Sequence, residues 1–320
     1  MTRPIFNLKK LLVLLPLCMI LVLVVLHPDL YGGAVFSGAE LYVKSVFPTM
    51  LPMLIFSGLF IKTGIADDIS IIMKKPMKKL FKAPPVAGYI TIISMLSGYP
   101  IGAKMVSDYY VSGIIDDEDA SRIATFSSTS GPMFIIGTVG SGFFNNARIG
   151  YILLIAHYLS ALFTGLIMCC PKRKSAYVEN RKPYLDSSSG NPIGEVFSNS
   201  MSTVLLVGGF VAIFYMLTEI LFLSGILDTL ESAGGTLLKG IAVSVVEMTR
   251  GTQLLSSYYD KKIAVAVAAA MISFGGLSVT MQSMAFYKTA HIRASRYLIS
   301  KLLQGTIAFG AAYLLIAVFI

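Results

Sequence analysis

Long apolar runs separated by short polar segments dominate the chain. Four uncharged runs are long enough to cross a membrane, which takes about 20 apolar residues; they are residues 83–103, 124–144, 263–287 and 302–320. Residues 11–26, 45–61, 151–170 and 201–222 form further apolar runs. Only 13% of the residues are charged, against about 25% in an ordinary soluble domain. The pattern predicts an all-α polytopic membrane protein.

Each half of the chain contains two interruptions of its apolar runs. The first half has them at residues 97–104 (SGYPIGAK) and 128–132 (STSGP), and the second half at residues 246–251 (VEMTRG) and 273–278 (SFGGLS). Irregular backbone is tolerated in a bilayer only where protein or a water-filled cavity surrounds it. Paired breaks in two halves are typical of the binding site of a secondary transporter.

The basic residues predict how the chain crosses the membrane. The net charge is +9, with clusters at residues 74–82 and 172–182, and such clusters mark cytoplasmic loops and contact anionic lipid. Residues 83–103 then lie between two cytoplasmic ends, which favours a re-entrant hairpin with its tip near Gly98–Pro100. Residues 240–259 lie between two outer ends and form a second hairpin candidate, with its tip near residues 247–251. The alternative, in which each hairpin is a full span, stays open.

The resulting organisation is a single integral membrane domain built from inverted repeats with two re-entrant hairpins and broken helices. We expect a signal-anchor helix in residues 1–30, a first repeat in 45–170, a cytoplasmic linker in 171–200 and a second, inverted repeat in 201–320. Basic residues around 74–82 interleave with apolar ones, which predicts a short interfacial helix.

Polar side chains inside the apolar segments are the candidate site residues. Hydroxyls near a helix break bind freed backbone groups or line a polar site, or they pack helices together. Gln282 is a substrate ligand or joins two helices. Lys104 is a cation at the site or extends to the cytoplasmic face. The full candidate set is Gly98, Tyr99, Pro100, Gly102, Lys104, Ser128, Thr129, Ser130, Glu247, Arg250, Ser273, Ser278 and Gln282.

Glu247 and Arg250 lie three residues apart, on one face of a helix. Ionisable groups inside a membrane are energetically expensive, so they are functional candidates. Either the two form a mutual ion pair, or Glu247 carries a coupling proton or cation while Arg250 attracts an anion. His157 and Glu219 have no patterned partner in the sequence, and we assign them to packing or hydrogen bonds between helices.

Several function classes find no support in the sequence. Cys18, Cys169 and Cys170 show no metal-ligand or disulfide spacing, and no catalytic or ATP-binding motif is present. We therefore expect no enzyme activity, no cofactor, no metal site and no nucleic-acid partner. The expected partners are a small-molecule substrate, membrane lipid, a coupling proton or sodium ion, and a second copy of the chain.

The motif at residues 97–104, together with 128–134 and 273–279, resembles the YlbJ (SpoVV-type) sporulation integral membrane proteins, which belong with the nucleoside-recognition or Gate domain proteins. The resemblance extends over about residues 47–286. It implies a fold similar to that of concentrative nucleoside transporters. It also implies transport of dipicolinate, a small planar dianion, across the outer forespore membrane, with Arg250 or Lys104 attracting the carboxylates. A nucleoside or nucleobase carrier and a structural sporulation protein without flux are the alternatives.

Overall fold

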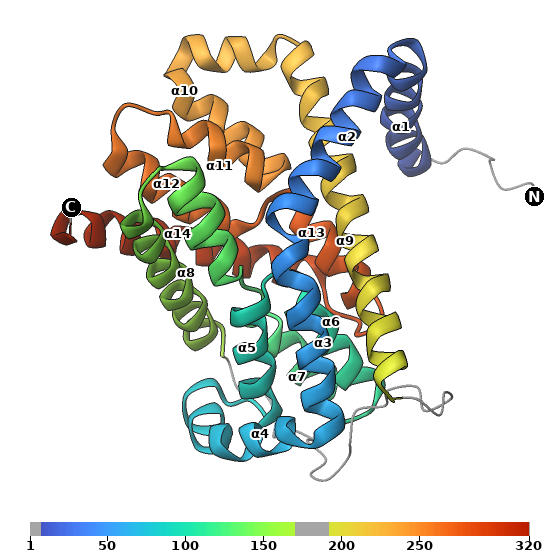
Figure 1. Cartoon of the computed structure of the whole chain (residues 1–320), viewed down its shortest axis with the longest axis vertical. Helices are drawn as coiled ribbons and strands as arrows, with labels where there is room; N and C mark the ends of the chain where they lie inside the picture. The colour runs from blue at the N-terminus through green and yellow to red at the C-terminus, as the bar shows by residue number, and fades with distance from the viewer. Residues whose placement is uncertain (1–7, 170–191, 320) are drawn as a thin grey trace, which may run out of the picture.

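The computed structural model describes residues 8–169 and 192–319, and every regular element in these two ranges is a helix (Figure 1). Four of the described helical segments are long and apolar enough to cross a membrane. Two further candidate spans are helix pairs bent by 107° and 86°. The predicted all-α polytopic membrane architecture is therefore confirmed.

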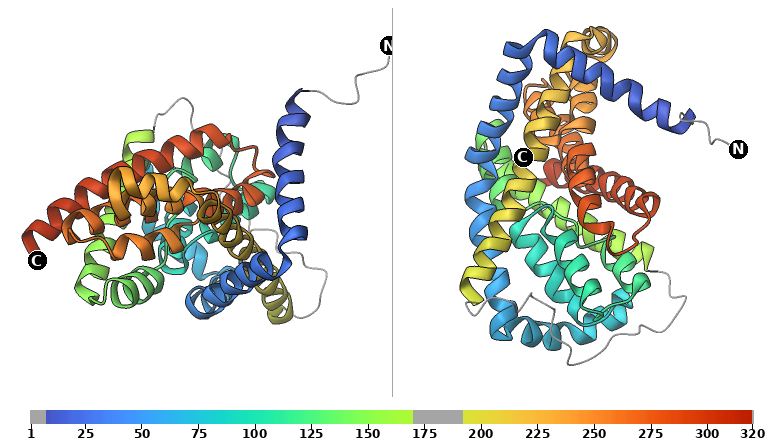
Figure 2. Two further views of the ribbon diagram at one scale, coloured as in Figure 1. Left: turned by 90° about the horizontal axis from the view of Figure 1, so that it is seen from above. Right: turned by 90° about the vertical axis from the view of Figure 1, so that its right-hand side faces the viewer.

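The N-terminal part of the fold differs from the prediction. Helix α1 (Leu8–Leu26) ends at a 107° bend, and α2 (Pro28–Ser45) begins directly after it. Proline is favoured in the first turn of a helix because its missing N–H would have no partner there. Helix α2 continues into α3 (Phe47–Thr63), since the Val46 N–H bonds the Tyr42 carbonyl at 2.9 Å. The helical segment that contains the predicted span 45–61 thus begins at Pro28, and α1 projects from the body of the protein (Figure 2).

The two halves run in opposite directions. Helix α9 (Pro192–Leu223) lies antiparallel to α2 and α3. Tyr42 Oη donates to the Val204 carbonyl at 2.7 Å, and Lys62 pairs with Glu195 at 2.9 Å. Residue numbers along α9 therefore decrease in the direction in which those along α2 and α3 increase. Inverted repeats require this antiparallel relation between corresponding helices.

A helical segment follows the first long helix of each half, at opposite ends of the molecule (Figure 1). In the first half it comprises α4 (Ile65–Pro76) and the π-helical η1 (Met77–Phe81), which buries Met77 and Phe81 and exposes Lys78 and Lys79. This matches the predicted amphipathic character. In the second half it is the start of α10 (Ile226–Val246), which kinks at Gly234–Gly235. The arm that leads into the second hairpin therefore follows this kink, slightly before the predicted start at residue 240.

Each half then has a helical hairpin, a broken helix and a long helix. In the first half these are α5 (Val86–Ser97) with α6 (Ile101–Val111), α7 (Asp117–Ile123) with the π-helical η2 (Met133–Phe143), and α8 (Ala147–Met168). In the second half they are α10 with α11 (Met248–Ser256), α12 (Lys261–Phe274) with α13 (Gly276–Tyr287), and α14 (Ala294–Phe319).

The helix breaks fall where the Gly, Pro and hydroxyl motifs predict them. The first hairpin turns at residues 98–100 and the second at Glu247. In the run 124–144 only the last part is regular, since residues 128–131 have no regular secondary structure. The side of the membrane on which each hairpin opens stays a prediction.

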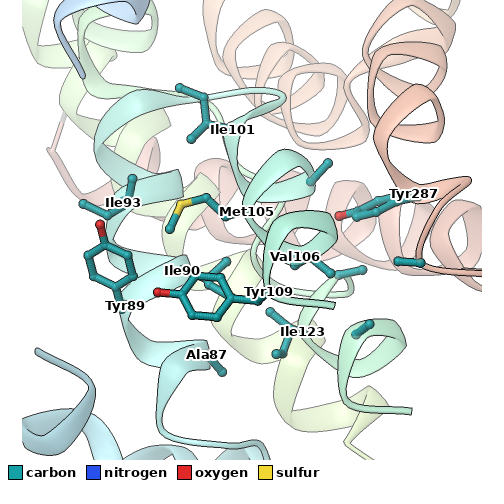
Figure 3. Close-up of a cluster of buried hydrophobic side chains, with 14 of the residues drawn as sticks. Ala87, Tyr89, Ile90, Ile93, Ile101, Met105, Val106, Tyr109, Ile123 and Tyr287 are labelled. Carbon is teal, nitrogen blue, oxygen red and sulfur yellow. The ribbon is translucent and has the colours of Figure 1, made fainter. Parts of the chain in front are cut away.

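A buried apolar cluster holds the first hairpin rigidly in the fold (Figure 3). Helices α5, α6, α7 and α13 all contribute side chains to it. The labelled members are Ala87, Tyr89, Ile90, Ile93, Ile101, Met105, Val106, Tyr109, Ile123 and Tyr287. Because α13 belongs to the second half, this core joins the hairpin of one repeat to the broken helix of the other.

Candidate functional site

The tip of the first hairpin rests directly on the break between α7 and η2. Gly98 has a φ of 88°, a left-handed conformation that favours glycine. A Cβ atom added there would lie 2.7 Å from the Gly131 nitrogen. A Cβ on Gly102, the second residue of α6, would lie 1.8 Å from the Ser127 carbonyl oxygen. Glycine at both positions allows two irregular backbone segments to meet inside the protein.

Tyr99 connects this contact to the second half of the chain. Its phenol oxygen lies 3.2 Å from the Ile272 carbonyl oxygen and 3.4 Å from that of Ser273, at the end of α12. It also accepts a hydrogen bond from the Lys301 ammonium at 2.9 Å. The breaks of both halves therefore converge on one side chain.

Lys301, on α14, is the cation of this site. Its ammonium group donates to Tyr99 Oη, to the Ser128 carbonyl oxygen at 2.9 Å and to Gln304 Oε1 at 2.8 Å. The side chain is 0% exposed. Within residues 8–169 and 192–319, no carboxylate lies within 4 Å of the ammonium. A buried charge without a counter-ion is costly, so the site has the electrostatics to bind an anion.

His157, on α8, links the two breaks. Its Nε2 atom accepts the Ser130 backbone N–H at 2.8 Å, and its Nδ1 atom lies 2.7 Å from Ser273 Oγ. A backbone N–H can only donate, so Nε2 is unprotonated and Nδ1 carries the ring proton. The imidazole is completely buried. It holds a residue from the broken helix of each repeat.

A layer of hydroxyl groups surrounds these residues. Ser128 Oγ lies 2.8 Å from Tyr297 Oη, and Ser94 Oγ lies 3.1 Å from Thr129 Oγ1. Two nearby buried polar atoms, Ser97 Oγ and Gln304 Nε2, have no hydrogen-bond partner among the described residues. Buried polar groups normally have partners, so these two atoms are available for a polar ligand.

Five predicted residues belong to this break network: Tyr99, Ser128, Thr129, Ser130 and Ser273. Gly98 and Gly102 form its close backbone contacts, and Pro100 precedes α6 as its N-terminal flanking residue.

Lys104, Ser278 and Gln282 have other partners. Lys104 pairs with Asp108 at 2.6 Å and lines a separate cavity of about 40 Å³ between α3, α6 and α9. Gln282 donates to Ser278 on its own helix at 3.1 Å.

Of the two alternatives for Glu247 and Arg250, the mutual side-chain ion pair is not present in the structure. The Glu247 carboxylate accepts the Arg250 backbone N–H at 2.8 Å and so caps α11. The Arg250 guanidinium instead pairs with Glu219 on α9 at 2.7 Å and lies 4.2 Å from the centre of the Phe222 ring. Glu219, for which we predicted packing or hydrogen bonds between helices, therefore joins α9 to α11 through an ion pair. The N-terminal position of Glu247 explains the difference, because its carboxylate is turned toward backbone N–H groups.

Sequence reasoning missed Lys301 and Tyr297. It assigned His157 to packing or hydrogen bonds between helices, and the imidazole does bond Ser273 on α12. Lys301 directly precedes the uncharged run 302–320 and is not among the candidate residues, although α14 extends from Ala294 to Phe319 and contains it. The available signal was spacing: Tyr297, Lys301 and Gln304 recur at intervals of four and three, which places them on one face of a helix.

The chain is similar to one named protein, the sporulation integral membrane protein YlbJ of Bacillus subtilis (strain 168). The two are 30% identical over 315 residues, which covers 89% of this chain and 77% of the relative. No protein-family model matches the chain, and no solved structure matches it.

Proposed function

This chain belongs to the YlbJ family of sporulation integral membrane proteins, and we propose that it transports a small anionic solute across a membrane. The observation that carries the proposal is Lys301, a fully buried cation without a described acidic partner, placed where the breaks of the two repeats meet. A structural membrane protein gains nothing from such a residue, because apolar packing would stabilise it better.

The chemistry around Lys301 favours a carboxylate as the ligand. The Lys301 ammonium donates to one phenol oxygen and two amide-type oxygens. Replacement of one of these neutral acceptors by a carboxylate oxygen would strengthen the hydrogen bond, because charge-assisted hydrogen bonds are stronger than neutral ones. The unpartnered Gln304 Nε2 and the Ser97 hydroxyl offer further donors for a second carboxylate.

Dipicolinate is the substrate that we propose for this site. It is a small planar dianion, and its two carboxylates suit one ammonium and several neutral donors. The relative's name places that protein in sporulation, and we extend this role, with action at the outer forespore membrane, to the present chain. The resemblance of the motif at residues 97–104 to the nucleoside-recognition proteins makes a nucleoside the second candidate.

Uptake into vesicles that contain the purified protein tests the proposal. We expect the unmodified protein to take up labelled dipicolinate and to discriminate against labelled uridine. Lys301→Gln should reduce dipicolinate uptake at least about tenfold, because one charge-assisted contact is worth about 1.5–3 kcal/mol. Lys104→Gln is the matched control, since that lysine is already paired with Asp108.

Three outcomes would contradict the proposal. Dipicolinate uptake that is unchanged in Lys301→Gln would remove Lys301 from the binding site. Uptake of uridine alone would favour the nucleoside carrier. Absence of flux for both solutes, in protein that is folded and correctly inserted, would favour a structural role.

A further inference from the structure

His157 occupies a position that anion binding alone does not explain. A lysine and a set of hydroxyls suffice to bind a carboxylate, yet an imidazole is completely buried beside them. Its protonated Nδ1 donates to Ser273 of the second half, and its Nε2 accepts the Ser130 backbone N–H of the first half. It is thus the side chain that joins the two broken helices to each other.

The bond from Ser130 to His157 exists only while the imidazole is neutral. Both ring nitrogens of an imidazolium carry a proton, so Nε2 could no longer accept the Ser130 N–H. Two N–H groups would then face each other, and the 128–131 segment would lose this attachment. Protonation of His157 therefore removes one of the hydrogen bonds that join the two halves where the breaks meet.

The surroundings of His157 connect its charge to the anion site. The Tyr99 ring lies 6.3 Å from the imidazole ring in an edge-on arrangement, and the Lys301 ammonium lies 4.7 Å from the centre of the same Tyr99 ring. Lys301 on α14 is the charged neighbour of this aromatic pair, through its contact with Tyr99. The other titratable neighbours are Tyr99 of the hairpin and Tyr158 of its own helix, while α12 and the 128–131 segment provide hydroxyls and backbone.

Like charges repel strongly in a poorly solvated interior. The ammonium of Lys301 therefore opposes a proton on His157 while the anion site is empty. A bound carboxylate would neutralise that field and favour the imidazolium. Binding of the anion then raises the affinity for the proton. By thermodynamic linkage, binding of the proton raises the affinity for the anion by the same factor.

We propose that His157 is the proton-coupling residue of this protein and a latch between its two repeats. This proposal rests on the proposed anion transport. The mechanism is a symport, in which one proton crosses the membrane together with the anion. The proton adds to Nε2 from water on the side where the anion enters, the Ser130 contact opens, and the proton leaves Nε2 to water on the other side as the anion departs.

A fluorescence experiment without any substrate tests the latch. The chain has no tryptophan, so Leu96→Trp introduces a single reporter beside the hairpin tip, at a position that is 48% exposed. In detergent, we expect its emission to change as the pH is lowered, because a proton on Nε2 breaks the Ser130 contact. The change should disappear when His157→Gln is added, because a glutamine amide can keep both hydrogen bonds but cannot titrate.

His27→Gln and His291→Gln are the matched controls, because these two histidines lie outside the break network and together with His157 make up the three in the chain. A pH response that persists in the His157→Gln background would overturn the latch, as would a flat response in the parent reporter.

A second measurement applies even if His157→Gln does not fold. The unmodified protein in vesicles that contain a pH-sensitive dye should acidify the lumen as dipicolinate enters. Dipicolinate entry without proton movement would overturn the coupling. Absence of dipicolinate entry, by contrast, would count against the proposed function, while the fluorescence titration would still decide the latch.

Discussion

Replacement of Gly102 by alanine is the sharpest test of how closely the two broken segments approach. The new methyl group would lie 1.8 Å from the Ser127 carbonyl oxygen and 2.7 Å from Ser94 Oγ. The serine hydroxyl can rotate, although its hydrogen bond to Thr129 would be disturbed. The carbonyl belongs to the backbone and cannot rotate away, so α6 and the segment after α7 must separate by about 1 Å to reach normal contact.

The magnitude follows from two opposing terms. Forced separation of packed groups costs about 1–3 kcal/mol, and the rigid backbone partner places Gly102→Ala at the upper end of this range. The better helix propensity of alanine returns up to about 1 kcal/mol. We therefore expect the free energy of unfolding to fall by about 2 kcal/mol.

Gly137→Ala in η2 is the matched control, because a Cβ there meets no atom within 4 Å. It should leave stability unchanged or raise it slightly. Thermal unfolding of both variants in detergent measures the difference, and the readout is the fraction of protein that stays monodisperse after heating. If Gly102→Ala unfolds at the same temperature as the unmodified protein, or if Gly137→Ala loses as much, the close approach described here is not what stabilises the site.

Three further predictions concern other parts of the fold. Gly276→Ala should lower the unfolding temperature, because its φ is 69° and its Cβ would lie 2.7 Å from the Ser244 carbonyl oxygen; an unchanged temperature would count against this contact. Glu219→Gln should destabilise the protein by about 1–3 kcal/mol in the same assay, because this change leaves the Arg250 cation unpaired. The double variant Glu219→Gln/Arg250→Gln should recover part of that loss, and strictly additive losses would argue against coupling of the two side chains. A membrane-impermeant thiol reagent applied to intact cells should label a cysteine that replaces Asp29 and should not label a cysteine that replaces Lys79. The reverse pattern would refute the predicted topology.

Local sequence properties account for the helices and their interruptions. A segment of apolar residues satisfies its backbone only as a helix in a bilayer, and Gly98, Pro100, Gly131 and Gly275 cannot continue a helix at low cost. The order of hairpin, broken helix and long helix could therefore be predicted for both halves. The one long element that the pattern missed was α2, whose mixture of glycine, polar and apolar residues lacks a continuous apolar run.

Side-chain partners depended on the tertiary structure. Arg250 pairs with Glu219, on a different helix, because capping of α11 already occupies Glu247. Lys301 meets Ser128, a residue 173 positions earlier in the chain, and no periodicity in the sequence carries that information. Apolar runs and helix breaks are set by the interaction of each segment with its own backbone and solvent, so the sequence alone determined the all-α membrane architecture and where it breaks. The identity of the buried cation and its link to His157 arise from contacts between the two repeats, which only the folded arrangement of both halves decided.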